Sequence, residues 1–425
     1  MVPRGGDGRV TATKSKERMM SEAYRTNNWW VSPFNFLPEV RQQIGQLPAR
    51  VRIHDATLRD GEQTPGVVFR KDEKVEIAKL LDDLGVDRIE VALPAVSDED
   101  VEATKAVAAL GLRAKTYVLV RATKADIDLA ADCGVDGVIL EMPAGVPRLT
   151  YQFPTWTEQT VIDKALSGIT QAKSRGLAVT LFPMDLSRAD PAFAERLFAA
   201  VAAHPDQPDG FAVVDTTGSM LPEACGYLTR RIREVIGCEV EIHTHNDFQL
   251  GVATPLAAVA AGATVVHCSV GGIGERTGNT ALDEVVVALK VLYGVETSIA
   301  CEKLTSVTAR VLELAGFHHA VSKPMVGERT FTRESGMGLD LVKEQPLALF
   351  ALNPAFLGQT AGYVLGKKSG IASIEMKMAD LGLATVDEAA CKKLLQEVKR
   401  VGTEKKGLVT DAEFLELYAT VVGKH

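Results

Sequence analysis

Two histidines separated by one residue give the clearest chemical signal in this chain. His243 and His245 end a β-branched run, Glu239–His245. Residues i and i+2 of a strand project from the same face, so both imidazoles can reach one ion. Imidazole nitrogens are common ligands of divalent cations. We therefore predict a metal site at the end of this run.

The oxygen ligands are expected from two other segments. Asp60 follows the first β-branched run, and Asn279 follows a glycine-rich turn, 271–278. A carboxylate and an amide oxygen beside two imidazoles form a mixed set that leaves positions open for water or substrate. Such a set is typical of a catalytic divalent cation and suits Mg²⁺, Mn²⁺, Co²⁺ or Zn²⁺ without choosing among them.

Three more polar residues stand at the ends of predicted strands. Arg59 is either a structural ion-pair partner or a fixed cation that stabilises a developing enolate or alkoxide. Gln63 and Thr216 could hydrogen-bond a substrate carboxylate or could simply shape turns. Other polar residues expected near this site hint at a polar or anionic substrate: Glu90, Glu141, Arg148 and Tyr151.

These residues can meet only in a fold that brings the ends of several strands together, and the sequence has the repeating pattern of such a fold. Apolar runs alternate with amphipathic helical patterns such as 71–84, 124–133, 158–175 and 253–260. The runs cover 50–58, 88–93, 114–120, 137–141, 178–184, 211–216, 239–245 and 264–270. Continuous apolar runs indicate parallel strands buried on both faces. Eight such units in about 240 residues predict a (β/α)₈ TIM barrel, with its active site at the carboxyl ends of the strands. A doubly wound open sheet is the alternative.

The rhythm also predicts the domain organisation. Residues 1–47 form an N-terminal extension, whose aromatic stretch 29–36 is expected to pack onto the body. Residues 48–297 form the catalytic barrel. Residues 298–425 form a mostly helical C-terminal subdomain, with helical patterns at 301–314, 386–401 and 411–421.

Composition excludes several functions. The 425 residues carry 47 Lys and Arg against 55 Asp and Glu, a formal net charge of −8, which argues against nucleic-acid binding. No run of about 18 apolar residues is present, and the polar N-terminus lacks the apolar stretch of a secretory signal. The six scattered cysteines predict reduced thiols. We expect a cytoplasmic protein without a membrane span.

With these residues in view, the chain resembles the DRE-TIM metallolyase superfamily over residues 48–420. The motifs that carry the resemblance are Leu-Arg-Asp-Gly-Glu-Gln at 58–63, Asp-Thr-Thr-Gly at 215–218, His-Thr-His-Asn-Asp at 243–247 and Gly-Ile-Gly-Glu-Arg-Thr-Gly-Asn at 272–279. The last motif, together with Lys74, is similar to the isopropylmalate, homocitrate and citramalate synthase branch.

The resemblance implies a reaction in which an acyl-CoA enolate attacks the keto carbon of a metal-bound 2-oxo acid, followed by thioester hydrolysis. Arg59 would polarise the reacting carbonyl, and Thr216 and Gln63 would orient the 2-oxo acid. The implied metal ligands are Asp60, His243, His245 and Asn279. The implied partners are the two small molecules, and family analogy implies a homodimer or larger homo-oligomer.

The chain departs from the synthase pattern where the acetyl proton is removed. A Glu-Asp pair after strand five reads Met184-Asp185, and a His-x-Ser-Gly-Ile-His pattern reads Arg-Glu-Ser-Gly-Met-Gly at 333–338; Gln249 also replaces a usual glycine. Met184 and Gly338 cannot act as bases. Another group could serve, with Asp185, Glu334 and His318 as candidates, or the carbanion could arise by decarboxylation or retro-aldol cleavage. We expect an intact 2-oxo-acid half-site and a rebuilt acyl-donor half-site.

Two other functions stay open at this point. One is a metal-dependent lyase or aldolase that cleaves a 2-hydroxy or 2-oxo acid without acetyl-CoA. The other is a non-catalytic homologue, against which the full set of proposed ligands and Arg59 argues. Ile273 stands where a cysteine would favour the hydroxymethylglutaryl-CoA lyase branch.

Overall fold

The computed structural model describes residues 23–423, so the first part of the predicted N-terminal extension, residues 1–22, lies outside the described residues. The described chain forms two compact units. One comprises residues 32–319, and the other combines residues 23–31 with 320–423. No helix in residues 23–423 is long and apolar enough to cross a membrane.

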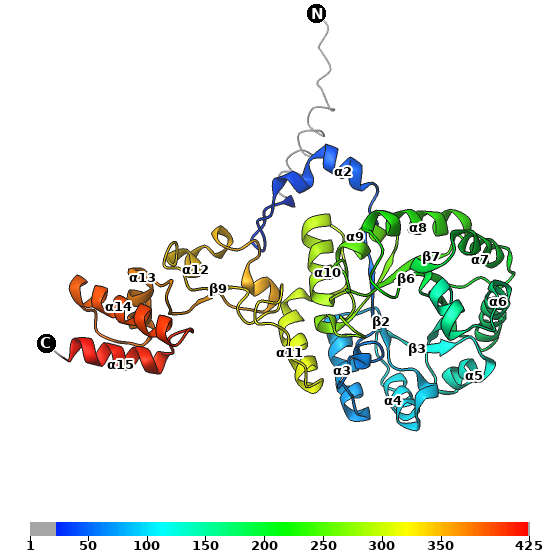
Figure 1. The fold of residues 1–425 in the computed structure, drawn as a ribbon, viewed down its shortest axis with the longest axis horizontal. Helices are drawn as coiled ribbons and strands as arrows, with labels where there is room; N and C mark the ends of the chain where they lie inside the picture. Colours follow the sequence, from blue (N-terminus) through cyan, green and yellow to red (C-terminus); the bar gives the residue numbers. More distant parts are fainter. Residues whose placement is uncertain (1–22, 424–425) are drawn as a thin grey trace, which may run out of the picture. The chain divides into compact units, whose positions relative to one another are not determined.

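The larger unit is a closed barrel of eight parallel strands that follow one another in chain order (Figure 1). The strands are β1 Arg52–Asp55, β2 Arg88–Glu90, β3 Lys115–Arg121, β4 Gly137–Pro143, β5 Ala178–Met184, β6 Gly210–Asp215, β7 Glu239–Thr244 and β8 Val265–Cys268. Because β1 pairs with both β2 and β8, the sheet has no edge. The predicted (β/α)₈ barrel is therefore confirmed, and the open sheet is excluded.

The strands are buried because both of their faces are covered. All six residues of β6, Gly-Phe-Ala-Val-Val-Asp, are buried, as are the central residues of β3 and β5. One face of each strand lines the barrel interior, and the other packs against the helical ring. This is why the runs read as continuously apolar rather than alternating.

Helices follow the strands around the outside of the barrel (Figure 1). They are α3 Lys71–Leu84, α4 Asp98–Ala108, α5 Lys124–Asp132, α6 Glu158–Ser174, α7 Pro191–Ala203, α8 Pro222–Val235, α9 Ala253–Ala260 and α10 Leu282–Ala288. The bounds of α3 and α9 coincide with the predicted helices. Several helices begin at a side-chain cap; the Thr123 side chain, for example, accepts a hydrogen bond from the Asp126 N–H.

The end of α3 shows how tightly the barrel closes. Gly85 has φ +102°, and a Cβ added there would lie 2.3 Å from the carbonyl oxygen of Ser298. Only glycine fits this left-handed position at such a close approach. Helix α11, Leu304–Leu314, packs against α3, so the barrel unit continues past its last strand.

The smaller unit is mostly helical, as predicted. It contains α12 Asp340–Glu344, α13 Ile371–Asp380, α14 Glu388–Glu404, α15 Asp411–Val422 and a parallel pair of two-residue strands, β9 Thr332–Arg333 and β10 Gly362–Tyr363. Its core includes Ile374, Leu394, Val398 and Phe414. Trp29 packs edge-to-face on Phe356 in this unit, whereas Phe34 remains 69% exposed.

Candidate metal centre and active site

The predicted nitrogen and carboxylate ligands meet at the carboxyl end of the barrel. Asp60 lies in the turn after β1, His243 ends β7, and His245 follows it. The Nε2 atoms of His243 and His245 lie 3.3 and 3.8 Å from Asp60 Oδ2 and 3.4 Å from each other. All three side chains are at most 5% exposed. Residues from two strands therefore converge as the sequence predicted.

Asn279 joins this group through the backbone. His245 and Asn279 form an isolated antiparallel bridge, and the Asn246 N–H donates to the Gly278 oxygen at 3.0 Å. The turn that carries Asn279 requires glycine, because a Cβ on Gly278 would lie 1.9 Å from the Gly272 oxygen. This agrees with the interpretation that the glycine-rich segment allows backbone to approach the site closely.

The donor set fits a divalent cation. The Asn279 Oδ1 is buried and has no hydrogen-bond partner in the described residues. Two imidazole nitrogens 3.4 Å apart also face the same carboxylate oxygen. A cation among these atoms would satisfy the buried amide oxygen and both nitrogens.

Burial and neighbouring charges keep the two imidazoles neutral and the Asp60 carboxylate ionised, which are the forms that can bind a cation. Burial lowers the pKa of His243 against the opposing pull of Asp60, and it lowers the pKa of His245 to about 4. Both imidazoles are therefore neutral near pH 7. Burial alone would raise the pKa of Asp60, but Arg59 and the two histidines hold that pKa well below its usual value.

Arg59 is fixed beside the candidate metal centre by two carboxylates. Its Nε and Nη2 donate to the two oxygens of Glu90 at 2.7 and 3.1 Å, and its Nη1 donates to Asp60 Oδ2 at 2.8 Å. Glu90 is fully buried and Arg59 is 8% exposed. Burial opposes the charge of this guanidinium, but Glu90 and Asp60 outweigh it and raise the Arg59 pKa. Arg59 is thus an ion-pair partner of Glu90 that also contacts Asp60, one of the candidate metal ligands.

Below this pair, a buried polar network continues through the barrel interior. His54 Nε2 lies 3.2 Å from Glu90 Oε2, and the His54 ring stacks on His267 with centroids 4.1 Å apart. His267 Nε2 lies 2.7 Å from Glu241, which accepts a hydrogen bond from Arg88 at 2.7 Å. Two arginines and two carboxylates are therefore joined by a histidine pair whose pKa values burial lowers. His54, Glu90 and His267 also have metal-ligand spacing, but Arg59 occupies both oxygens of Glu90.

Gln63 lies where a substrate could reach it. It is exposed in the turn Gly61–Gln63 and lines a cavity of about 340 Å³ together with Arg59, Leu93 and Val96. Lys74 lies behind this cavity, buried, with its Nζ 2.7 Å from Glu62 and 3.0 Å from Asp100. The Lys74 ion pairs hold the two acidic residues that complete the cavity wall.

Thr216 lies on a different part of the barrel end. It directly follows β6, and its hydroxyl oxygen accepts a hydrogen bond from the Asp185 N–H at 2.8 Å. The Thr216 carbonyl accepts from Arg276, which is paired with Asp247 at 2.9 Å. Gln63 and Thr216 thus flank the barrel end from separate strands.

The three candidate bases lie in different parts of the molecule. Asp185 is buried with φ +66°, and both of its carboxylate oxygens accept from Arg188 at 2.8 and 2.7 Å. His318 is exposed after α11. Glu334 lies in the smaller unit, where its carboxylate accepts from the Lys368 N–H at 2.9 Å.

Glu141 is a carboxylate that the sequence marked only as lining the site. It lies on β4 in register with Phe182, whose ring contacts His243 at a centroid distance of 5.0 Å. No hydrogen bond to its carboxylate comes from the described residues. Burial raises the Glu141 pKa, Arg59 opposes this, and Glu90 reinforces it.

The residues that converge here were named from the sequence, but some of their hydrogen-bond partners were missed. Glu90 was marked only as lining the site, although it holds Arg59, and Glu241 was not singled out. No local motif marks either residue, because each follows from pairing across the barrel. A carboxylate within an otherwise apolar strand run, as at Glu90, was the available signal.

Comparison with known proteins identifies the family of the chain. Residues 50–311 match the HMGL-like family, and residues 325–406 match the homocitrate synthase post-HMGL domain-like family. The chain therefore belongs to the HMGL-like family of TIM barrels, the DRE-TIM group that its motifs resemble.

Similar proteins place it within the synthase branch of that family. The chain is 37% identical to the homocitrate synthase AksA of Methanopyrus kandleri, over 91% of this chain and 96% of that protein. It is 38% identical to the 2-isopropylmalate synthase of Methanocaldococcus jannaschii, over 89% of this chain and 73% of that protein. It is 38% identical to the (R)-citramalate synthase CimA of the same organism, over 88% of this chain and 75% of that protein.

Solved structures confirm the barrel. The HMG-CoA lyase of Bacillus subtilis superimposes with a TM-score of 0.57 at 19% identity, covering 64% of this chain and 95% of that one. At this identity the likeness shows the fold alone.

Proposed function

We propose that this protein is a divalent-metal-dependent enzyme that condenses an acyl-CoA with a 2-oxo acid. One arrangement carries the proposal: Asp60, His243 and His245 converge while Arg59, clamped by Glu90, points at the same carboxylate. Relatives named homocitrate, 2-isopropylmalate and citramalate synthases support the reaction class.

The metal would be held by Asp60, His243, His245 and Asn279, and when bound it would polarise the carbonyl of the 2-oxo acid. Arg59 would stabilise the negative oxygen that develops. A guanidinium has five N–H groups, and three of these are engaged by Glu90 and Asp60. The remaining two are free to donate to a substrate oxygen without reorganisation of the side chain.

The carboxylate of the 2-oxo acid would be oriented by Gln63 and Thr216. The Thr216 hydroxyl oxygen already accepts from Asp185 N–H, so its own proton is available to a substrate oxygen. Gln63 lines the cavity beside Arg59 and offers an amide donor. The two residues would then grip the substrate from separate strands.

The acyl-donor half of the site differs from the synthase pattern, and we propose that Glu141 receives the proton. Both carboxylate oxygens of Asp185 already accept hydrogen bonds from Arg188. Gly338 has φ +69°, a backbone conformation that disfavours a histidine at this position. Glu141 is the carboxylate that combines a raised pKa with electrostatic coupling to Arg59 and no hydrogen-bond donor on its oxygens in the described residues.

Thiol release tests the proposal. Full-length protein is supplied with Mg²⁺ or Mn²⁺, a panel of 2-oxo acids, and acetyl-, propionyl- or malonyl-CoA, and free CoA is followed with a thiol reagent. Release that requires both an acyl-CoA and a 2-oxo acid is expected, and the best pair would name the substrates. Release with malonyl-CoA alone among the donors would indicate that decarboxylation replaces the base.

A lyase or aldolase is the second candidate, favoured by Met184 at the place of the usual glutamate. It would use the same metal ligands and Arg59 to stabilise the enolate released by cleavage. No CoA release with any pair, together with cleavage of a 2-hydroxy acid, would support it. Bound metal without either reaction would support a non-catalytic homologue. A homodimer or larger homo-oligomer and a cytoplasmic location stay predictions.

A further inference from the structure

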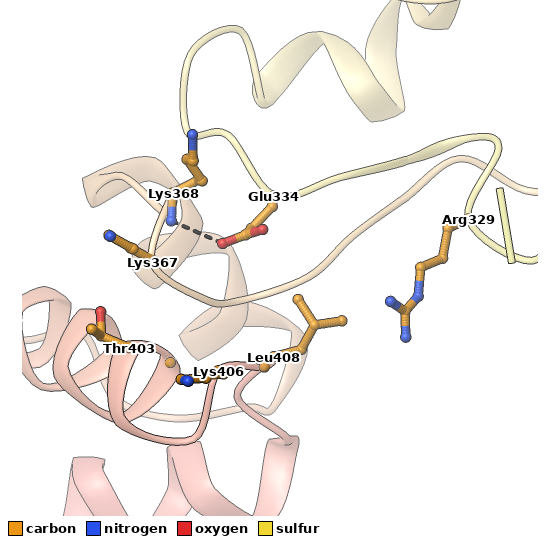
Figure 2. Close-up of a pocket in the computed structure, with 9 residues that line it drawn as sticks. Arg329, Glu334, Lys367, Lys368, Thr403, Lys406 and Leu408 are labelled. Atoms are coloured by element: carbon orange, nitrogen blue, oxygen red, sulfur yellow. Dashed lines mark hydrogen bonds between the residues drawn. The ribbon is translucent and has the colours of Figure 1, made fainter.

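A hollow in the smaller unit is rich in positive charge. Its volume is about 670 Å³, and it lies between the loop that precedes α13, the end of α14 and the segment before and after β9. Its cationic residues are Arg329, Lys367, Lys368 and Lys406. Figure 2 shows Arg329 and Lys367 on opposite sides, with Leu408 between them and Lys406 at the α14 end.

The positive charge of this hollow is not neutralised by neighbouring acids. Among residues 23–423, none of the four cations has a carboxylate oxygen within 4.0 Å. Some other lysines of the same unit are paired: Lys405 lies 2.7 Å from Glu413, and Lys377 lies 2.6 Å from Asp411. In a chain with a net charge of −8, this is a local surplus of the opposite sign.

Glu334, the acidic residue of the hollow, has a structural task. Its Oε1 accepts from the Lys368 backbone N–H at 2.9 Å, which ties the loop to the segment after β9 (Figure 2). A Cβ on Gly366 would lie 2.5 Å from the same oxygen, so glycine is needed for this contact. The Lys368 side chain points away from the other labelled residues in Figure 2, which leaves Arg329, Lys367 and Lys406 as the relevant cations.

Lys406 lies in a Schellman cap at the end of α14, because the Lys406 N–H donates to the Thr403 oxygen at 3.3 Å and the Gly407 N–H donates to the Gly402 oxygen at 3.1 Å. Lys406 has φ +52°, a left-handed conformation that costs a non-glycine residue about 1 kcal/mol or more. Such a position after a helix usually holds glycine, and here Gly407 follows it. The favourable effect of a cation at the helix end is already supplied by Lys405. The cap sets this backbone conformation, and the lysine side chain adds a cation to the lining of the hollow.

From these observations the geometry points to a binding site for a phosphate-bearing small molecule, formed by Arg329, Lys367 and Lys406. Arginine recognises phosphate through its planar fork, and lysine does so as a point charge. The volume is in the range that holds a nucleotide-sized ligand, and Leu408 offers an apolar surface to such a ligand. The phosphate could belong to a CoA thioester or to a free nucleotide or diphosphate.

Calorimetric titration of the full-length protein tests this site. The probes are CoA, dephospho-CoA, ATP and inorganic pyrophosphate at low ionic strength. The test variant combines Lys367→Ala with Lys406→Gly, since glycine relieves the strain at φ +52° and protects folding. The matched control combines Lys393→Ala with Lys399→Ala, which removes the same charge from exposed positions on α14 outside the hollow.

We expect at least one probe to bind, with a Kd that rises about tenfold or more in the test variant and less than twofold in the control. CoA binding that exceeds dephospho-CoA binding would identify the thioester as the source of the phosphate. If ATP or pyrophosphate binding weakens in the test variant as much as CoA binding does, the ligand is a free nucleotide or diphosphate. Absence of binding by all four probes, or equal effects in both variants, would overturn the site. The result does not depend on the condensation reaction, because binding is measured without a 2-oxo acid.

Discussion

The guanidinium of Arg59 forms a bidentate ion pair with the carboxylate of Glu90, with Nε–Oε1 and Nη2–Oε2 distances of 2.7 and 3.1 Å. This geometry leaves the Nη1 of Arg59 beside Asp60 at 2.8 Å. The position of the proposed catalytic cation therefore depends on a residue one strand away that need not touch the substrate. Glu90 is a positioning residue, and its role can be separated from that of the metal ligands.

Replacement of Glu90 by Gln should lower kcat for CoA release by about 100-fold, because the neutral amide no longer fixes the Arg59 fork. Metal content should stay stoichiometric, since Asp60 and both histidines remain. Glu241→Gln is the matched control: it removes another fully buried carboxylate, paired with Arg88 at 2.7 Å, without touching Arg59. A similar loss of kcat in both variants would show that general destabilisation explains the effect.

Metal binding should depend on the convergent donors. Asp60→Asn and His245→Ala should each weaken affinity for Mn²⁺ by about 100-fold or more, because each removes a direct ligand from a buried set. Asn279→Ala should have a smaller effect, since it removes a neutral oxygen. Metal per chain after chelation and reloading is the measurement, and His204→Ala outside the site is the control. Unchanged metal content in Asp60→Asn would exclude this centre.

Much of this architecture could be predicted because it depends on residues that are close together in the sequence. Each of the eight apolar runs overlaps one of the eight strands, and the His243–His245 spacing placed the imidazoles on one face. Partners across the barrel could not be predicted in the same way. His54 and His267 stack because β1 pairs with β8 in the register His54↔His267, and that register exists only when the barrel closes.

Strand ends were the least predictable feature. The first run was expected to reach residue 58, but β1 ends at Asp55, because the chain turns there so that the N–H groups of Asp60 and Gly61 both donate to the Ala56 oxygen. This turn swings Asp60 toward β7. This candidate ligand therefore lies beyond the strand, where the hydrophobic pattern gives no information.

The contribution of the buried Asp55 to the free energy of unfolding should fall as pH rises from about 4 to 7. Burial raises the Asp55 pKa from 3.8 to about 7 in the folded chain. Over this interval the unfolded chain loses the proton while the folded chain retains it, so the unfolded state becomes relatively more stable. Asp55→Asn removes this dependence and keeps the oxygen that accepts from the Thr57 N–H at 2.9 Å.

Urea unfolding of both proteins at several pH values measures the effect. The difference in free energy of unfolding, Asp55→Asn minus unmodified, should become more positive from pH 4 to pH 7 and level off above pH 7. A difference that is independent of pH would show that Asp55 titrates normally in the folded chain.

Glu141→Gln should lower kcat by about 100-fold or more for turnover that requires removal of an acyl-CoA proton. The acid limb of the pH profile of kcat should lie above the ordinary glutamate value, because the pKa of Glu141 is raised. This limb should disappear in the variant. Retention of the limb would assign the proton transfer to another group, and Asp185→Asn would then be tested next.

Met184→Glu should restore a base at the end of β5 and raise CoA release from acetyl-CoA by at least about tenfold, since a positioned base contributes about 10² to 10⁴ in rate. The backbone there is already fixed, because the Ala144 N–H donates to the Met184 oxygen at 2.9 Å. Met184→Gln matches the size without a base and should leave the rate unchanged. Equal rates in the two variants would mean that position 184 does not reach the acyl donor. Gly338→His alone should contribute little, because its φ of +69° makes any side chain strained at that turn.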